Sequence, residues 1–165
     1  MHCYSGMPDA KPSPTETAAD TAFMQAALDE ARASATRGEI PIGALIVSRG
    51  QIIARAGNRT IMDTDPTAHA EIVALREAAL RLGNYRLIDT TMYVTIEPCA
   101  MCAGALIQAR VARLVYGADD RRAGAVRSHF SILSHDALNH RVQVTTGILA
   151  EECLGLLRDF FLTRR

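Results

Sequence analysis

Apolar residues recur along the chain with two different spacings, and these spacings predict helices that alternate with strands. Apolar positions three or four residues apart, typical of one face of a helix, occur in residues 17–37, 69–82, 99–109 and 149–165. The apolar face of the first helix consists of Met24, Leu28, Ala31 and Ala35. Gly38 follows this segment and is the residue type expected where a helix ends.

Shorter apolar segments predict five β-strands, in residues 40–47, 51–56, 91–96, 113–116 and 142–146. The first is a nearly unbroken apolar run, which is typical of a strand buried on both faces. The turn sequence Ser48-Arg49-Gly50 joins it to the second strand, so the two predict a hairpin. The later strands are mostly separated by helices. This order predicts an α/β fold with a mixed sheet covered by helices on both faces.

Two segments lie outside this alternation. Residues 1–16 contain three prolines among serine, threonine and glycine residues, and we expect them to form a disordered extension before a single domain, residues 17–165. Residues 118–141 connect two predicted strands and contain few apolar side chains. A long connection of this kind is a candidate functional loop.

The strongest candidate for a metal site is the segment from Glu97 to Cys102, which reads E-P-C-A-M-C. Pro98 favours the first turn of a helix, where its missing N–H has no partner in any case. Cys99 and Cys102 then lie on one face of that turn. The positive end of the helix dipole favours thiolates, which are the form of cysteine that binds metal.

A third metal ligand is expected in the T-A-H-A-E segment that ends at Glu71. His69 and Glu71 are two residues apart and would point to opposite sides of a regular helix, so they can serve one site only if His69 stands at the helix start. Pro66 and Thr67 are start signals at the right place. The predicted ligands are one histidine and two cysteines, with Glu71 close to the metal but not required to touch it. Three protein ligands leave a fourth position open, as in catalytic zinc sites.

The pattern H-x-E followed by P-C-x-x-C resembles the signature of the zinc-dependent nucleoside and nucleobase deaminases. The resemblance extends over about residues 21–165 and is greatest to the bacterial tRNA-specific adenosine deaminases. The matching stretches are residues 39–44 (EIPIGA), 57–59 (GNR), 65–71 (DPTAHAE), 84–87 (NYRL) and 160–161 (FF).

This resemblance implies a three-layer α/β/α cytidine-deaminase-like fold with a mixed five-stranded sheet. It implies one Zn²⁺ per chain, held by His69, Cys99 and Cys102. The implied reaction is the hydrolytic deamination of adenosine to inosine at the wobble position of a tRNA anticodon, by a zinc-activated water.

The resemblance also assigns roles to individual residues. It makes Glu71 the catalytic proton shuttle. It places Asn58, Ala70 and Asp120 at the substrate, although an asparagine at the end of a strand is more often a turn residue. It further implies a homodimer, and the apolar residues on more than one side of helix 99–109 favour the same conclusion. The expected RNA partner is the anticodon stem-loop of tRNA, and no protein cofactor is expected.

Composition gives no support to nucleic-acid binding, because 18 basic and 18 acidic residues give a formal net charge of zero. Any RNA surface must therefore be a local patch. Arg164 and Arg165, at the end of the last helix, are predicted phosphate contacts. Further candidates with the same chemistry are Arg121, Arg122, Arg127 and Arg158. For any one of them, an ordinary solvated charge is an equally good interpretation.

The remaining composition indicates a cytoplasmic domain. At 165 residues and 48% hydrophobic, the chain has enough material for one core. No apolar run is long enough to cross a membrane, and the first residues lack the pattern of a signal peptide. Cys153 lies in an apolar helical stripe and is expected to be a small core residue.

Three other interpretations remain open at this point. A deaminase of free guanine or cytosine would share both metal motifs but would need a closing lid and no basic rim. An inactive RNA-binding subunit of a paired deaminase is also conceivable, although the presence of Glu71 argues against it. A closed structural zinc site would need a fourth protein ligand, for which His129, His135 and His140 are available.

Overall fold

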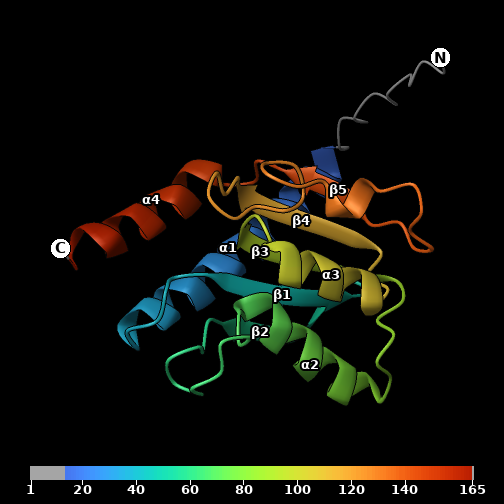
Figure 1. Ribbon diagram of the computed structural model, residues 1–165, viewed down its shortest axis with the longest axis horizontal. Coiled ribbons are helices and arrows are strands. Elements are labelled where there is room, and N and C mark those ends of the chain that lie inside the picture. Colours follow the sequence, from blue (N-terminus) through green and yellow to red (C-terminus); the bar gives the residue numbers. More distant parts are fainter. Residues whose placement is uncertain (1–13, 165) are drawn as a thin grey trace.

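The computed structural model describes residues 14–164, so Arg165 and most of the expected N-terminal extension lie outside it. Within these residues the helices are α1 (Pro14–Thr36), α2 (Ala70–Leu82), α3 (Ala100–Gln108) and α4 (Ala150–Leu162), with a short 3₁₀ turn, η1 (Ile132–Ser134). The strands are β1 (Gly43–Ser48), β2 (Gln51–Gly57), β3 (Thr90–Ile96), β4 (Arg113–Ala118) and β5 (Gln143–Thr146) (Figure 1).

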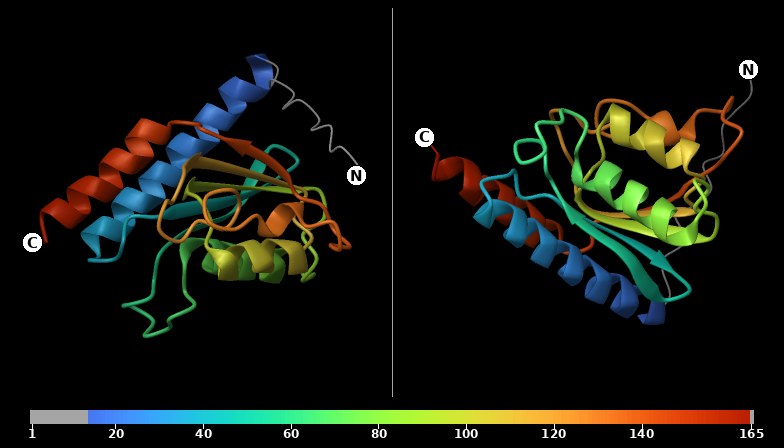
Figure 2. Two further views of the ribbon diagram at one scale, coloured as in Figure 1. Left: turned by 45° about the horizontal axis from the view of Figure 1, so that its top comes forward. Right: turned by 90° about the horizontal axis from the view of Figure 1, so that it is seen from below.

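The strands form one mixed sheet in the order β2-β1-β3-β4-β5. β1 pairs antiparallel with both β2 and β3, and β3, β4 and β5 run parallel. Helices α1 and α4 lie side by side on one face of the sheet, and α2 and α3 cover the other face (Figure 2). The predicted three-layer α/β/α fold with a five-stranded mixed sheet is confirmed.

β1 shows why the sheet is buried on both faces. Ala44 and Ile46 point into the core beneath α2 and α3, whereas Leu45 and Val47 point into the core beneath α1 and α4. Alternate residues of a strand face opposite sides of the sheet, so a strand covered on both sides needs an unbroken apolar run. Cys153 is 1% exposed in the core beneath α1 and α4. This burial agrees with the prediction that it is a small core residue.

Helix α1 is held against the sheet by close packing and by one buried ion pair. A Cβ atom added at Gly43 would lie 1.9 Å from the carbonyl oxygen of Ala27, so α1 can approach β1 only because this residue is glycine. The buried carboxylate of Asp20 accepts hydrogen bonds from the Tyr93 hydroxyl at 2.7 Å and from the Arg113 guanidinium at 2.7 and 2.9 Å.

The element boundaries differ from the predicted ones at a few places. β1 begins at Gly43 rather than at residue 40, α1 begins at Pro14 rather than at residue 17, and α4 ends at Leu162. Helices α2 and α3 each begin one residue later than predicted, because His69 and Cys99 keep extended backbone angles as N-cap residues. This last difference shapes the candidate site.

Candidate active site

The N-termini of α2 and α3 converge at one end of the sheet, and each supplies side chains to the same small volume. His69 is the N-cap residue of α2, with φ −66° and ψ 153°. Cys99 is the N-cap residue of α3, with φ −73° and ψ 176°. An N-cap residue does not have helical backbone angles, so its side chain need not point in the direction that the helical repeat would give it. Cys102, in the first turn of α3, completes the group.

The three side chains lie at the separations that a tetrahedral metal site requires. The Nδ1 atom of His69 is 3.6 Å from the Sγ atom of Cys99 and 3.6 Å from the Sγ atom of Cys102. All three ligand atoms lie within 4.8 Å of one another. Zinc bonds of about 2.3 Å to sulfur and 2.05 Å to nitrogen, at a tetrahedral angle, give an N···S distance of about 3.6 Å. The residues present therefore fit zinc.

The protonation states of the three side chains are linked by the contacts among them. The hydrogen bond with Cys102 lowers the pKa of Cys99 to about 3 against the opposing effect of burial, and His69 adds to this lowering. The same bond, together with burial, raises the pKa of Cys102 far above its usual value. The bond with Cys99 raises the pKa of His69. A divalent cation would displace the protons that this group shares, because metal binding needs thiolates and a neutral imidazole.

Glu71 lies beside this group in the first turn of α2 and is only 4% exposed. Among the side chains that the structure describes, its Oε2 atom is the buried oxygen or nitrogen that lacks a hydrogen-bond partner. Burial raises the pKa of Glu71 to about 7, and a cation bound nearby would lower this value. A buried carboxylate without a partner is costly, so its position indicates a ligand or substrate that it meets.

The candidate metal group has three members within residues 14–164, and neither Glu71 nor a further histidine joins it. The histidines of the long loop have other contacts. His140 bonds through Nε2 to the carbonyl oxygen of Val111 at 2.7 Å, and the ring of His129 bonds to the carbonyl oxygen of Arg121. Nδ1 of His135 accepts the N–H of Ala137 at 3.2 Å. The arrangement therefore favours an open site over a closed structural one.

Asn58 and Ala70 are bonded to each other at the edge of the group. The Oδ1 atom of Asn58, a residue only 3% exposed, accepts the N–H of Ala70 at 2.9 Å. The bond joins the end of β2 to the first turn of α2 and satisfies one of the free donors at the helix start. The side chain of Ala70 is itself fully buried. A contact of either residue with substrate stays a prediction.

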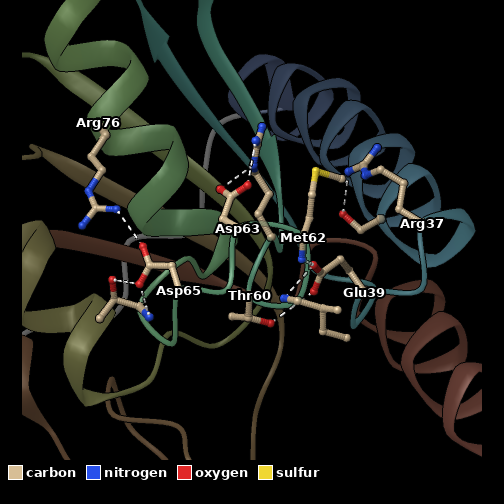
Figure 3. A network of polar contacts seen from close by, with 11 residues as sticks. Arg37, Glu39, Thr60, Met62, Asp63, Asp65 and Arg76 are labelled. Atoms are coloured by element: carbon tan, nitrogen blue, oxygen red, sulfur yellow. Dashed lines mark hydrogen bonds and ion pairs between the residues drawn. The ribbon is translucent and has the colours of Figure 1, made fainter.

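Sequence reasoning gave no role to Glu39, which organises the loop between β2 and α2 (Figure 3). Glu39 is fully buried and accepts the N–H groups of Ile61 and Met62 at 2.9 and 2.8 Å and the hydroxyl of Thr60 at 3.1 Å. The ion pairs Arg59–Asp63 and Arg76–Asp65 close the same loop at 2.8 and 3.4 Å. The signal in the sequence was a lone carboxylate directly before an apolar strand.

Glu97 precedes α3 in the chain, but its side chain bonds to the long loop. Its carboxylate is 3% exposed and accepts hydrogen bonds from residues 120–128 of the long loop rather than from the start of α3. Burial alone would raise the pKa of Glu97, but the bonds from Arg127, Ser128 and Asp120 together lower it.

Two of the predicted RNA contacts have partners within the chain. Asp120 accepts the N–H groups of Arg122 and Ala123 at 2.8 and 3.2 Å, which fixes a tight turn. Arg164 donates to the carbonyl oxygen of Gly38 at 3.0 Å, and its guanidinium lies 4.1 Å from the ring centre of Phe160. Arg165 lies outside the described residues. For all three, contact with RNA stays a prediction.

Comparison with known proteins gives the family. A family model described as MafB19-like deaminase matches residues 18–165. The chain is 48% identical over 147 residues to the tRNA-specific adenosine deaminase of Haemophilus influenzae, which covers 88% of this chain and 85% of that protein. It is 43% identical over 142 residues to the tRNA-specific adenosine deaminase of Bacillus subtilis, with 86% and 88% of the two chains covered.

Solved structures agree with the sequence relatives. A structure from work on A-to-I editing by tRNA:A34 deaminases at the wobble position of transfer RNA has a TM-score of 0.81 and 47% identity, over 83% of this chain and 99% of that one. A guanine deaminase from Nitrosomonas europaea has a TM-score of 0.71 and 26% identity, over 97% and 98%. The chain belongs to the MafB19-like deaminase family and, within it, to the group of the tRNA-specific adenosine deaminases.

Proposed function

We propose that this protein is a zinc-dependent enzyme that converts adenosine to inosine at the wobble position of a tRNA anticodon by hydrolysis. The observation that carries the proposal is the group of His69, Cys99 and Cys102 at zinc spacing. Beside it lies the Oε2 atom of Glu71, which has no hydrogen-bond partner among the described residues. The identity of 43–48% to proteins named tRNA-specific adenosine deaminase supports the substrate.

His69, Cys99 and Cys102 would hold one Zn²⁺ per chain through Nδ1 and the two Sγ atoms. When bound, zinc supplies a Lewis acid that lowers the pKa of a water molecule from about 16 to about 7. The chain's own contribution is the carboxylate of Glu71. It accepts a proton from the attacking water and delivers it to N1 of the purine. It then accepts the remaining proton of that oxygen and passes it to the amino group, which leaves C6 as ammonia. The water oxygen becomes the 6-oxo group of inosine.

The substrate must present one base out of its stack. Nucleotides of an anticodon loop are already single-stranded, which lowers the cost of turning the adenine into the site. We assign Asn58 and Ala70 to the base and its ribose, since they border the metal group. Asp120, Arg164 and Arg165 are assigned to the surrounding RNA.

The substrate is tested by one preparation assayed against several compounds. We expect inosine to form in tRNA, measured after digestion to nucleosides, and no product from free guanine, adenine or cytosine. Deamination of guanine without any inosine in tRNA would overturn the proposal. That second activity is a specific alternative, because a solved guanine deaminase matches 97% of this chain. That guanine deaminase is 26% identical to this chain, whereas the structure from the tRNA:A34 deaminase work is 47% identical. The higher identity favours tRNA as the substrate.

We also infer that the enzyme acts as a homodimer. Helix α3 is apolar on nearly all sides, and Met101 on it remains 37% exposed. Phe130, in the segment that leads to η1 over α3, is 59% exposed. Exposed large apolar side chains of this kind are found at interfaces between chains.

The proposed location is the cytoplasm, because the proposed substrate is tRNA. No helix in the described part of the chain has the length and apolar character needed to cross a membrane.

A further inference from the structure

Glu97, which directly follows strand β3, is a buried carboxylate with no role in the proposed deamination. Glu97 lies two residues before Cys99 and is 3% exposed. Its Oε1 atom accepts the N–H groups of Val126, Arg127 and Ser128 at 3.0, 2.8 and 3.0 Å. Its Oε2 atom accepts the N–H of Asp120 at 3.0 Å and the hydroxyl of Ser128. One side chain thus gathers five donors from a loop 23 to 31 residues further along the chain.

The loop is also tied directly to the segment that supplies a metal ligand. Cys99 and Gly124 form an isolated antiparallel bridge, and the N–H of Ala125 donates to the carbonyl oxygen of Pro98 at 2.9 Å. A Cβ atom at Gly124 would lie 2.3 Å from Oε2 of Glu97, so the loop backbone reaches the carboxylate only because this residue is glycine. Movement of the loop and movement of Cys99 are therefore linked.

The same loop carries three arginines, the residue type that pairs with phosphate. Arg121, Arg122 and Arg127 line a cavity of about 480 Å³ between this loop and α4, with Leu154 and Leu157 among its apolar lining. Arg127 is oriented by its ion pair with Asp119 at 2.9 Å. Contacts within the loop set its shape. Glu97 and the bridge to Cys99, together with the burial of Ala125 and Val126 in the core, set its place relative to the metal group.

The chemistry of the cluster calls for a carboxylate. All five groups that meet Glu97 are donors, so each of its two oxygens is used as an acceptor. An amide of the same shape offers one acceptor oxygen and turns an N–H₂ group toward the remaining donors. Buried donors that lose their acceptor are costly, so the loop would leave this position.

We propose that Glu97 is a positioning residue, which holds residues 120–128 against Cys99 and so places the loop's RNA-contacting side chains at a fixed distance from the metal group. This inference rests on the proposed tRNA deaminase function and adds a residue to its substrate recognition. Glu97 touches neither the metal group nor the reacting base.

The test is the variant Glu97→Gln, compared with the parent protein in zinc content, in steady-state kinetics on tRNA, and in hydrogen exchange of the loop amides. We expect one zinc per chain to be retained. We expect the KM for tRNA to rise by about tenfold or more, with a smaller change in kcat. The amides of Asp120, Val126, Arg127 and Ser128 should exchange faster, while those of β3 keep their protection. An unchanged KM together with unchanged loop protection would overturn the proposal.

Two further variants separate positioning from general stability. Asp20→Asn also alters a buried carboxylate, but one between α1 and the sheet, so it should lower the melting temperature and leave KM for tRNA unchanged. If Asp20→Asn raises KM as much as Glu97→Gln does, the effect is one of stability and the proposal fails. Gly124→Ala pushes the loop away from an intact Glu97 and should reproduce the kinetics of Glu97→Gln with zinc retained. Gly124→Ala tests the same proposal if Glu97→Gln does not fold.

The exchange measurement also distinguishes this inference from the proposed function. If the parent protein forms no inosine in tRNA, the proposed function fails, whatever Glu97 does. If the parent is active but Glu97→Gln leaves the loop amides and KM unchanged, only the positioning role fails.

Discussion

At the scale of single residues, the proposed site has three groups that would hold the metal and one group that would move protons. His69 and Glu71 are separated by one residue, yet they reach the same volume because His69 stands outside α2 as its N-cap. The Nδ1 atom of His69 lies 3.6 Å from both cysteine sulfurs, whereas Oε2 of Glu71 has no hydrogen-bond partner among residues 14–164. Replacement of these residues should therefore have separable effects.

Glu71→Gln should remove activity without removing the metal. The amide keeps the shape of the side chain but cannot accept the proton of the attacking water. General acid–base catalysis typically supplies about a hundred- to ten-thousand-fold in rate, and Glu71 serves more than one transfer, so we expect a loss at or above the upper end. Zinc content by elemental analysis, melting temperature and tRNA binding should stay near the parent values. Loss of zinc would instead identify Glu71 as a ligand.

Cys99→Ala is the matched comparison and should lose metal, stability and activity together. Cys99 is a proposed metal ligand and the N-cap of α3, and a metal that binds only the folded chain stabilises that chain by mass action. The melting temperature of the parent protein should fall on treatment with a strong chelator, and that of Cys99→Ala should not respond. A variant that still holds one zinc per chain would show that the ligands are others.

At the scale of whole elements, the tightest contact lies between α1 and β1. Gly43→Ala would place a methyl group 1.9 Å from the carbonyl oxygen of Ala27 and 2.6 Å from the backbone nitrogen of Ala31. The helix must shift, and we expect a loss of about 1–3 kcal/mol in the free energy of unfolding, measured by urea denaturation. Gly155→Ala in α4, where nothing lies within 4 Å of the added atom, should stabilise by about 0.5–1 kcal/mol. Equal effects of the two changes would contradict this view of the packing.

The elements that sequence predicts well are those with a local pattern. β1 is buried on both faces and therefore has an unbroken apolar run. α2 is buried on one face and therefore has apolar residues at helical spacing. The motifs H-x-E and P-C-x-x-C also predict the grouping of His69 with Cys99 and Cys102. Glu39 and Glu97 were not foreseen as loop anchors. They accept N–H groups from residues 22 to 31 positions away. Nearly every residue type has a backbone N–H group, so the sequence does not indicate which ones a carboxylate will meet.

At the scale of the whole molecule, a net charge of zero must be reconciled with an RNA substrate. Binding then depends on where the arginines lie rather than on how many there are. The double change of Arg164 and Arg165 to Ala should weaken tRNA binding and reduce the slope of log K against log salt by about one for each phosphate that is no longer neutralised. Arg49→Ala is the control, because Arg49 lies in the β1–β2 turn, at the opposite end of β2 from Asn58. Unchanged binding at every salt concentration would remove Arg164 and Arg165 from the interface.

The exposed apolar side chains predict how two chains meet. Met101 on α3 and Phe130, two residues before η1, are 37% and 59% exposed, and η1 contacts α3. Light scattering at micromolar protein should give twice the 17.9 kDa mass of one chain. Met101→Glu would bury a charge in that interface and should shift the mass toward a single chain. Leu162→Glu, at the end of α4 in the opposite layer where Leu162 is 58% exposed, should leave the dimer intact. If Leu162→Glu dissociates the dimer and Met101→Glu does not, the interface lies on the α1–α4 layer instead.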